Sequence, residues 1–508
     1  MSTSTPPSSP PKAGRRAWWA LGILVLAVVL LTVDGTVLYL AIPSLSAELD
    51  PSTTQLLWIG DIYSFALGGL LITMGNLADR IGRKRLLLIG SALFGVASLV
   101  AAMAPNAELL IAARALLGVA GATIMPSTLS IVRNLFLDPK QRTKAIAIWS
   151  AGATAGAAVG PLVGGVLLEH FYWGSVFLIN VPIMVVIVVG GALLLPESRG
   201  DTRKPIDLGS AALSVVMIIG LVYAIKHVFS DGFDWKVAFA AVVGLVAGWL
   251  FFRTQTRLAQ PLVDVSLFRI PAFSGAVLSN ALSSFAFTGL LFFFSQYLQL
   301  VRDLGPLKAG IAELPGTAGS MVVIGIIGFV EAKLGVGRSI GLGHFLIGVA
   351  LLGIGLTVHL DTYWGLGISL AVLGFGVGIV MTLSTDAMVS AVPKERAGAA
   401  SSLAETGYEL GIAMGIAVLG SLHARMYRSH LDIPAGTEPH KADALGDSLA
   451  TGTSVLTDPA DAPLLRAAEQ AFTDAMTTSS VIAACIVFAV AVLAWRVIPV
   501  TVAGKGEH

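Results

Sequence analysis

The sequence predicts an all-α polytopic membrane protein with fourteen transmembrane helices, arranged as two pseudo-symmetric six-helix halves with two further helices inserted between them. Three observations support this fold class. Hydrophobic residues make up 55% and charged residues 12% of the 508 residues, and apolar runs of about 20 residues recur along the chain. Lys and Arg gather in every second connection between these runs. Glycine patterns of the first half return in the second half.

The apolar runs predict the spans in order along the chain. They lie near residues 18–42, 55–77, 86–104, 107–132, 143–168, 173–195, 208–227, 236–252, 272–298, 309–330, 339–358, 364–391, 397–423 and 475–498. The third and fourth runs are closely spaced, as are the twelfth and thirteenth, so each of these pairs has one long segment as its alternative. The first run is too long for the apolar core of a signal peptide, so it is expected to remain as a span.

The spans divide the chain into predicted regions. These are a disordered cytoplasmic tail at 1–14, an N-terminal six-helix half at 15–200, two inserted transmembrane helices at 201–264, a C-terminal six-helix half at 265–500 and a cytoplasmic tail at 501–508. The C-terminal half contains an extracytoplasmic loop at about 427–474 that is rich in acids. We expect this loop to be solvated, and a cover over an outer vestibule is the alternative.

Basic residues test the number of spans independently. With fourteen spans, most of the 32 Lys and Arg residues fall in connections on the side of the N-terminus, so the positive-inside rule places both termini in the cytoplasm. With thirteen spans, the Lys and Arg residues would no longer gather on one side of the membrane. Lys226 is assigned to an outward connection, and Arg114 is assigned as the only basic residue within a span. Arg114 needs a carboxylate or carbonyl partner there, and a structural ion pair and a proton-coupling role both stay open.

Carboxylates inside the predicted spans are the main candidates for function. A charge at bilayer depth costs about 2.5 to 3.5 kcal/mol, so such acids take a proton, form a pair or meet a cationic ligand. The candidates for binding a substrate cation or a proton are Asp34, Asp61, Asp386, Glu405 and Glu409, with Glu313 as a weaker candidate near the outer end of its span.

The predicted depths of these acids differ. Asp34 and Asp61 fall in the outward halves of the first two spans. A neutral acid bonded to a neighbouring helix is the alternative for Asp34, and a structural role at the outer end is the alternative for Asp61. Asp386 lies close to the inner end of its span, where its side chain can reach water.

The thirteenth predicted span separates acids from glycines around its axis. Glu405 and Glu409 are one turn apart and share a face. The glycines at 407, 411 and 415 lie about 200° around the helix, so they can pack while the acids line a cavity. A purely structural role for one of the two glutamates is the alternative.

A charged glycine motif occupies the turn after the second span. It consists of Gly75, Asp79, Arg80, Gly82 and Arg83. A glycine permits the tight turn, and an Asp beside Arg residues forms charge-assisted hydrogen bonds that hold helix ends together. A simple positive-inside cluster is the alternative. After the tenth span, Gly328, Lys333 and Gly335 repeat the offsets of Gly75, Arg80 and Gly82, which indicates an internal repeat.

These motifs resemble the major facilitator superfamily. The turn motif resembles the family's connection between its second and third helices, and Arg114 with Gly118 and Gly121 resembles its fourth-helix motif. The residues that resemble the fifth-helix motif associated with antiporters include Gly156, Gly160, Pro161 and Gly164. From residue 15 to residue 500, the chain is similar to the fourteen-span drug:proton antiporter branch of bacterial multidrug exporters.

The resemblance implies the major facilitator fold, a bacterial inner (cytoplasmic) membrane location and a monomer. It implies that Asp34 and Asp61 handle cationic drugs or protons, and that Glu405 and Glu409 belong to an acidic cluster of the second half. Ala404 and Ser320 stand where the resemblance implies further acids.

The predicted function is proton-coupled antiport that exports lipophilic cations, such as quaternary ammonium compounds and ethidium-like dyes, by alternating access. A dedicated exporter of an antibiotic or other natural product is the alternative, and the sequence leaves a passive channel open. No P-loop, HExxH or nucleophile motif is present, which argues against an enzyme. Cys485 is the only cysteine, so no thiolate metal site is expected, nor is a cofactor or a nucleic-acid partner.

Overall fold

The computed structural model describes residues 13–198, 207–230, 232–258, 261–392, 397–434 and 436–498. The predicted tails at 1–14 and 501–508 fall outside these residues, except for residues 13 and 14. The helices are α1 (Arg15–Leu49), α2 (Thr53–Ile81), α3 (Arg83–Ala102), α4 (Ala107–Leu135), α5 (Pro139–His170), α6 (Ser175–Leu178), α7 (Asn180–Leu194), α8 (Leu208–Ser230), α9 (Trp235–Gln255), η1 (Val265–Arg269), α10 (Pro271–Gln296), η2 (Tyr297–Val301), α11 (Pro306–Leu334), α12 (Val336–Thr357), α13 (Trp364–Ser390), α14 (Ala397–His430), α15 (Pro439–Asp447), α16 (Leu449–Val455), η4 (Pro459–Asp461) and α17 (Ala462–Val497).

Local sequence signals explain where several helices begin and end. The Ser52 side chain accepts a hydrogen bond from the Gln55 backbone N–H at the start of α2, and the Gln55 side chain accepts one from the Ser52 backbone N–H at 2.8 Å. Asn106 caps α4 and Asp138 caps α5 in a similar way, with one side-chain acceptor each. Gly82 ends α2 at φ +114°, a conformation that side chains with a Cβ rarely adopt.

The predicted all-α architecture with about fourteen spans is confirmed. Among the described residues, thirteen helices are long and apolar enough to cross a membrane, and α5, which bends by 40°, brings the number to fourteen. The closely spaced runs form separate helices, α3 and α4, and α13 and α14. Several helices run past the predicted spans, because hydropathy marks the hydrocarbon-facing part while backbone hydrogen bonding continues into the polar interface. For example, α14 extends to His430 rather than to residue 423.

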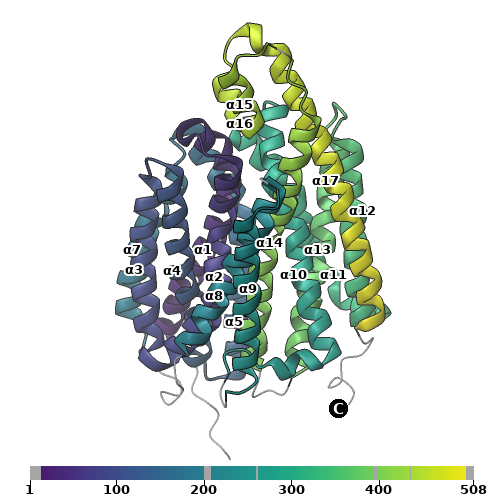
Figure 1. Ribbon diagram of the computed structural model, residues 1–508. Helices are drawn as coiled ribbons and strands as arrows, with labels where there is room; N and C mark the ends of the chain where they lie inside the picture. Colours follow the sequence, from purple (N-terminus) through teal and green to yellow (C-terminus); the bar gives the residue numbers. More distant parts are fainter. Residues whose placement is uncertain are drawn as a thin grey trace, which may run out of the picture.

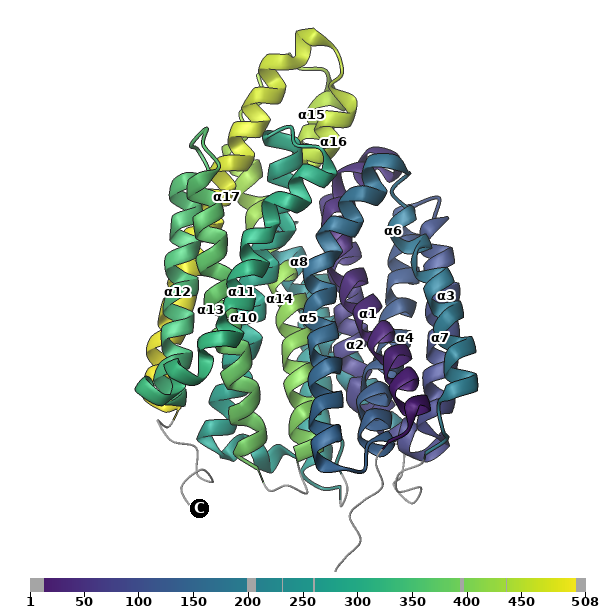
Figure 2. The ribbon, with the colours of Figure 1, turned by 180° about the vertical axis from the view of Figure 1, so that it is seen from behind.

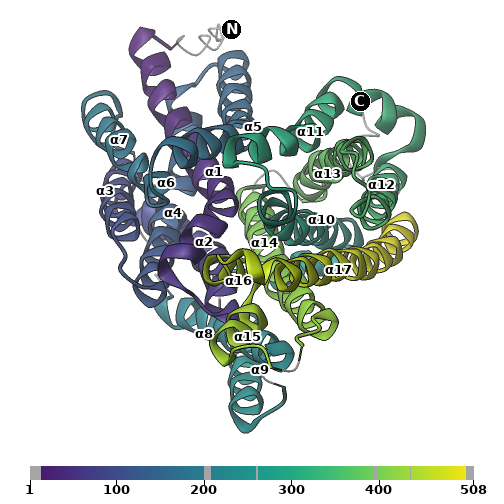
Figure 3. The same cartoon turned by 90° about the horizontal axis from the view of Figure 1, so that it is seen from above.

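Helices α1 to α7 form a first bundle, and helices α10 to α14 with α17 form a second. The two bundles repeat the same packing pattern. In the first bundle, α1 packs against α5, α2 against α4, and α3 against α7. In the second bundle, α10 packs against α14, α11 against α13, and α12 against α17. The turn glycines Gly82 and Gly335, which end α2 and α11, both have positive φ. The helix order and these shared contacts indicate two structurally related units, which Figure 3 shows side by side.

Two helix pairs join the bundles. Helix α2 meets α14, where Leu57 contacts Gly420, and α5 meets α11, where Leu307 lies against Gly165. These two pairs are equivalent under the repeat. Leu57 and Leu307 lie in the first turns of α2 and α11, and α15 and α16 sit at one end of the molecule (Figures 1 and 2). Both ends of the described chain lie at the opposite end.

Helices α8 and α9 form a pair beside the two bundles. Helix α8 packs against α9, against α2 of the first bundle and against α14 of the second (Figure 3). Helix α8 therefore lies next to α2 and α14, one of the two helix pairs that join the bundles.

The segment between α14 and α17, which the sequence predicts as a solvated loop, contains regular secondary structure. It contains the short helices α15 and α16, and we call residues 439–461 the cap (Figure 1). Lys441 of α15 donates a hydrogen bond to Asp461 at 2.9 Å, which ties the cap together. The Thr53 hydroxyl at the start of α2 donates to the Asp447 carbonyl oxygen. Polar contacts that are distant in sequence hold this segment, and the charge composition alone does not reveal them.

Candidate functional site

Asp34 is the carboxylate of a buried ion pair. The Arg114 Nη1 lies 3.3 Å from Asp34 Oδ2, and the two side chains are 2% and 0% exposed. Asn180 of α7 donates a hydrogen bond to Asp34 Oδ1 at 2.7 Å. Arg114 also donates from Nε to the Ile59 carbonyl at 3.1 Å, and its guanidinium lies 4.8 Å from the centre of the Tyr63 ring. The pair joins α1, α4 and α7, and both oxygens of Asp34 have protein partners.

Asp61 is also paired with a buried cation. The Lys226 Nζ lies 2.9 Å from Asp61 Oδ1 and 2.8 Å from Asp61 Oδ2, and both side chains are 0% exposed. The assignment of Lys226 to an outward connection is therefore wrong, and Arg114 is not the only basic residue within a span. Helix α8 continues to Ser230, beyond the predicted end of the span at residue 227. The apolar Val228 and Phe229 after Lys226 were the available sequence signal.

The acids of the second half lie in a different environment. Glu409 of α14 is 8% exposed and Glu313 of α11 is 7% exposed, while Glu405 is partly buried. One carboxylate oxygen of Glu313 and one of Glu409 have no hydrogen-bond partner in the described part of the chain. Unlike Asp34 and Asp61, these three acids have no basic partner among the residues that the structure describes.

The second-half acids approach the first bundle. A Cβ built on Gly68 of α2 would lie 3.1 Å from the Glu409 Cβ, so the glycine lets α14 come close. The Glu409 carboxyl is also within hydrogen-bonding reach of Ser64 on α2. Tyr39 of α1 interacts electrostatically with Asp61, Glu313 and Glu409. Acids from α2, α11 and α14 therefore lie within electrostatic range of Tyr39.

The glycines of α14 pack against α10, on the side of the helix opposite to Glu405 and Glu409, as their spacing in the sequence predicts. A Cβ on Gly411 would meet the backbone of Ala281 on α10, and one on Gly415 would meet the backbone of Phe285. Asp386 does not join the acids near Tyr39: it lies exposed near the C-terminal end of α13.

The turn motif after α2 joins three helix ends. Arg83 donates to Asp79 Oδ1 from Nη2 at 2.8 Å and from Nε at 3.1 Å, which links the end of α2 to the start of α3. Glu197, which follows α7, accepts a hydrogen bond from the Lys84 backbone N–H at 3.2 Å. Glu197 was not predicted, because its place beside this turn depends on the return of the chain through α7. Gly75 packs against Pro126 of α4, and Arg80 lies in the last turn of α2.

Replacing Gly82 with alanine is expected to destabilise the protein by about 1 to 2 kcal/mol. The residue has φ +114°, and an added Cβ would lie 2.6 Å from Glu197 Oε1. The melting temperature of purified protein in detergent measures the effect. The matched control is Gly328→Ala, because nothing lies within 4 Å of an added Cβ there. Equal melting temperatures for the two variants would contradict a strained turn.

The fifth-helix glycines pack against α1. A Cβ on Gly156 would lie 2.7 Å from the Val29 carbonyl oxygen, and one on Gly160 would meet the Thr36 side chain. Gly164 lies against Val37 in the same way. The backbone of Pro161 faces the other bundle, since a Cβ added to Gly310 of α11 would meet the Pro161 carbonyl oxygen. Helix α5 therefore packs closely on α1 with one face and meets α11 with another.

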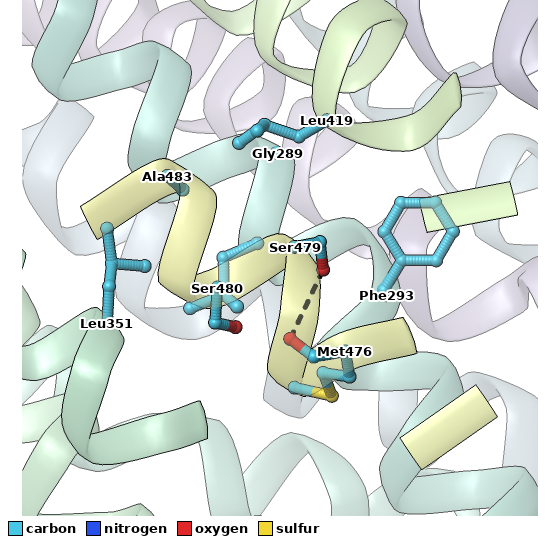
Figure 4. Close-up of a pocket in the computed structure, with 9 residues that line it drawn as sticks. Gly289, Phe293, Leu351, Leu419, Met476, Ser479, Ser480 and Ala483 are labelled. Atoms are coloured by element: carbon cyan, nitrogen blue, oxygen red, sulfur yellow. Dashed lines mark hydrogen bonds between the residues drawn. The ribbon is translucent and has the colours of Figure 1, made fainter. Parts of the chain in front are cut away.

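A small cavity inside the second bundle is separate from the acids. It lies between α10, α12, α14 and α17 (Figure 4). Its lining residues are Gly289, Leu290, Phe293, Leu351, Leu419, Met476, Ser479, Ser480 and Ala483. None of them is charged, so this cavity is not the candidate site for a cation.

Comparisons with known sequences match almost the whole chain. The sequence profile of the Major Facilitator Superfamily matches residues 24–416. The multidrug efflux pump LfrA of Mycolicibacterium smegmatis is 45% identical, over 94% of this chain and 95% of that protein. The methyl viologen resistance protein SmvA of Salmonella typhimurium is 37% identical, over 90% of this chain and 93% of that protein. The tetracenomycin C resistance and export protein of Streptomyces glaucescens is 33% identical, over 80% and 76%.

Solved structures share the architecture at low sequence identity. A bacterial homologue of the human lysosomal transporter Spinster, in an inward-facing and unoccupied conformation, matches with a TM-score of 0.67 and 19% identity, over 96% of this chain and 98% of that one. A peptide transporter in complex with sulfate matches with a TM-score of 0.63 and 15% identity, over 96% and 98%.

Proposed function

Because this chain belongs to the major facilitator superfamily of membrane transporters, we propose that it exports lipophilic cationic drugs in exchange for protons, by alternating access between its two bundles. Relatives named for multidrug efflux and for methyl viologen resistance support drug export. Methyl viologen is a cation, which favours cationic substrates. The proposed location is the bacterial inner membrane, with the cap outside, both termini in the cytoplasm and the monomer as the working unit.

The observation that carries the proposal is the difference between the two groups of buried acids. Asp34 and Asp61 already hold ion pairs with Arg114 and Lys226. Glu409, Glu405 and Glu313 have no such cation in the described part of the chain. Acids at this depth that lack a protein cation are suited to hold a proton or a cationic ligand. We therefore assign the exchange to the second-half glutamates rather than to Asp34.

Competition for the same carboxylate couples the two fluxes. A carboxylate that holds a proton no longer attracts a cation strongly, so proton binding favours drug release and proton loss favours drug binding. The membrane voltage contributes about 2.3 kcal/mol per charge per 100 mV to such an exchange. Aromatic residues of α1 and α10, such as Tyr39 and Phe292, whose rings lie 6.1 Å apart, would provide apolar and cation–π surface for varied cations.

The test is ethidium transport in proteoliposomes that carry a pH gradient. Glu409→Gln is expected to lower the gradient-driven flux by about 10-fold or more, because a neutral amide cannot exchange a proton for a cation. The matched control is Glu438→Gln, whose side chain precedes the cap and is 62% exposed. Equal flux for Glu409→Gln and the native protein would reject the assignment. Saturable counterflow of ethidium in the native protein would separate a carrier from a pore.

A dedicated exporter of one antibiotic is the second candidate. The tetracenomycin C and puromycin resistance proteins, which are 33% and 30% identical to this chain, favour it. Competition against ethidium flux across a panel of cations and neutral antibiotics distinguishes the two functions. Inhibition by many unrelated cations supports multidrug export, and inhibition by one compound class supports the dedicated exporter.

A further inference from the structure

The environment of Lys226 has the composition of a cation-binding site. Its Nζ lies 3.8 Å from the centre of the Trp58 ring on α2. The same nitrogen contacts both carboxylate oxygens of Asp61, at 2.9 Å and 2.8 Å. Trp58 and Asp61 are three residues apart on α2, so they lie on neighbouring positions of one helix face. A carboxylate beside an indole face is the combination that binds ammonium groups on apolar stems.

The lysine comes from outside the two repeated bundles. Helix α8, the first of the inserted pair, packs against both α2 and α14. One turn away from the ion pair, Phe65 of α2 and Val222 of α8 form an apolar cluster with Ala413 and Ala417 of α14. The Ser214 hydroxyl of α8 also donates a hydrogen bond to the Gly69 carbonyl of α2 at 3.4 Å. The inserted helix therefore presents its one lysine to α2 at a fixed position beside the junction of the bundles.

We propose that Trp58 and Asp61 form a second cation-binding site, suited to primary alkylammonium groups, and that the Lys226 ammonium is its built-in occupant. This proposal rests on the proposed export of cations, since it explains how a cation leaves. A cation that moves from the second-half glutamates toward the cap end meets a carboxylate that is already paired with Lys226. It is therefore not retained there. Without Lys226, Asp61 would be an unpaired carboxylate near the exit and would trap the cation.

The first test is binding of n-butylammonium, which reproduces the stem and charge of the lysine, to purified Lys226→Ala protein in detergent. The truncation leaves room for the ligand beside Trp58 and Asp61. At about ten times its dissociation constant, n-butylammonium is expected to raise the melting temperature of this variant by about 2 °C. Neutral n-butanol is the matched ligand control, and the native protein and Asp61→Asn/Lys226→Ala are the matched protein controls.

The outcomes decide the proposal without any transport measurement. Stabilisation of Lys226→Ala by n-butylammonium alone supports it. Equal stabilisation by n-butanol, equal stabilisation of the double variant, or no stabilisation of Lys226→Ala overturns it. The proposed export function fails separately, if gradient-driven ethidium flux is absent from the native protein.

A second variant covers the case in which Lys226→Ala does not fold. Lys226→Met keeps a long stem without the charge. If the transported cation is trapped at Asp61 in this variant, the KM for ethidium and the maximal flux per folded protein both fall, by about 10-fold when the cation stays paired with Asp61. Asp61→Asn as a second substitution is then expected to restore both values. A lower maximal flux with an unchanged or higher KM would show that the lysine is only structural.

Discussion

Replacing Arg114 with methionine is expected to lower the free energy of unfolding by about 3 to 5 kcal/mol and to abolish transport, because the substitution leaves a buried carboxylate without its cation. Arg114 and Asp34 are 1% and 0% exposed, so water cannot replace the lost charge. The substitution also removes the hydrogen bond from Arg114 Nε to the Ile59 carbonyl. Unfolding of the purified protein in mixed micelles measures the loss.

The matched control for this prediction is the double variant Asp34→Asn/Arg114→Met. Removing both charges is expected to recover most of the lost stability, since a neutral amide is far less costly to bury than an unpaired carboxylate. Asn180 can still hydrogen-bond the new amide oxygen. The single variant Asp34→Asn completes the comparison. If the losses of unfolding free energy in Asp34→Asn and Arg114→Met simply add in the double variant, Asp34 and Arg114 are not coupled and the prediction is wrong.

Replacing Gly156 with valine is expected to produce the second large effect. The new Cβ would lie 2.7 Å from the Val29 carbonyl oxygen and 3.1 Å from its Cα, and these backbone atoms cannot move without displacing α1. Overpacking at such a close contact between two helices lowers the free energy of unfolding by about 1 to 3 kcal/mol. Because α5 also meets α11 of the other bundle, we expect the ethidium flux per folded protein to fall as well. The melting temperature and the flux measure the two effects separately.

Gly325→Val is the matched control for Gly156→Val. It also places a branched side chain in a transmembrane helix, but nothing lies within 4 Å of an added Cβ at this position. We expect its melting temperature and its flux to stay close to the native values. A loss as large as that of Gly156→Val would mean that helix propensity, rather than the contact of α5 with α1, explains the effect.

The sequence contains most of the information on the fold, because hydropathy reports directly which segments can lie in a bilayer. All of the predicted spans correspond to helices, and the glycines of α14 pack where their phase indicates. The helix ends were less predictable. Lys226 shows the reason: it lies inside the predicted span at 208–227, its charge favours an outward connection, and the structure places it in a buried ion pair within α8.

The pairing of the acids could not be predicted from the sequence. Asp34 and Arg114 are 80 residues apart, and Asp61 and Lys226 are 165 residues apart. Helical periodicity places a side chain on its own helix but does not identify the neighbouring helix. The acids were therefore found as a set, while the difference between the paired acids and Glu409 became visible only in three dimensions. Asn180, an uncharged residue, gave no distinct signal in the sequence.

The cap has a mechanical consequence for the alternating access that we propose. By its covalent connections it belongs to the second bundle, since it links α14 to α17, but Asp447 is bonded to Thr53 of the first bundle. Any rotation that separates the bundles at this end must break that hydrogen bond or pull the cap along with α2. The cap therefore acts as a tether between the two bundles at this end.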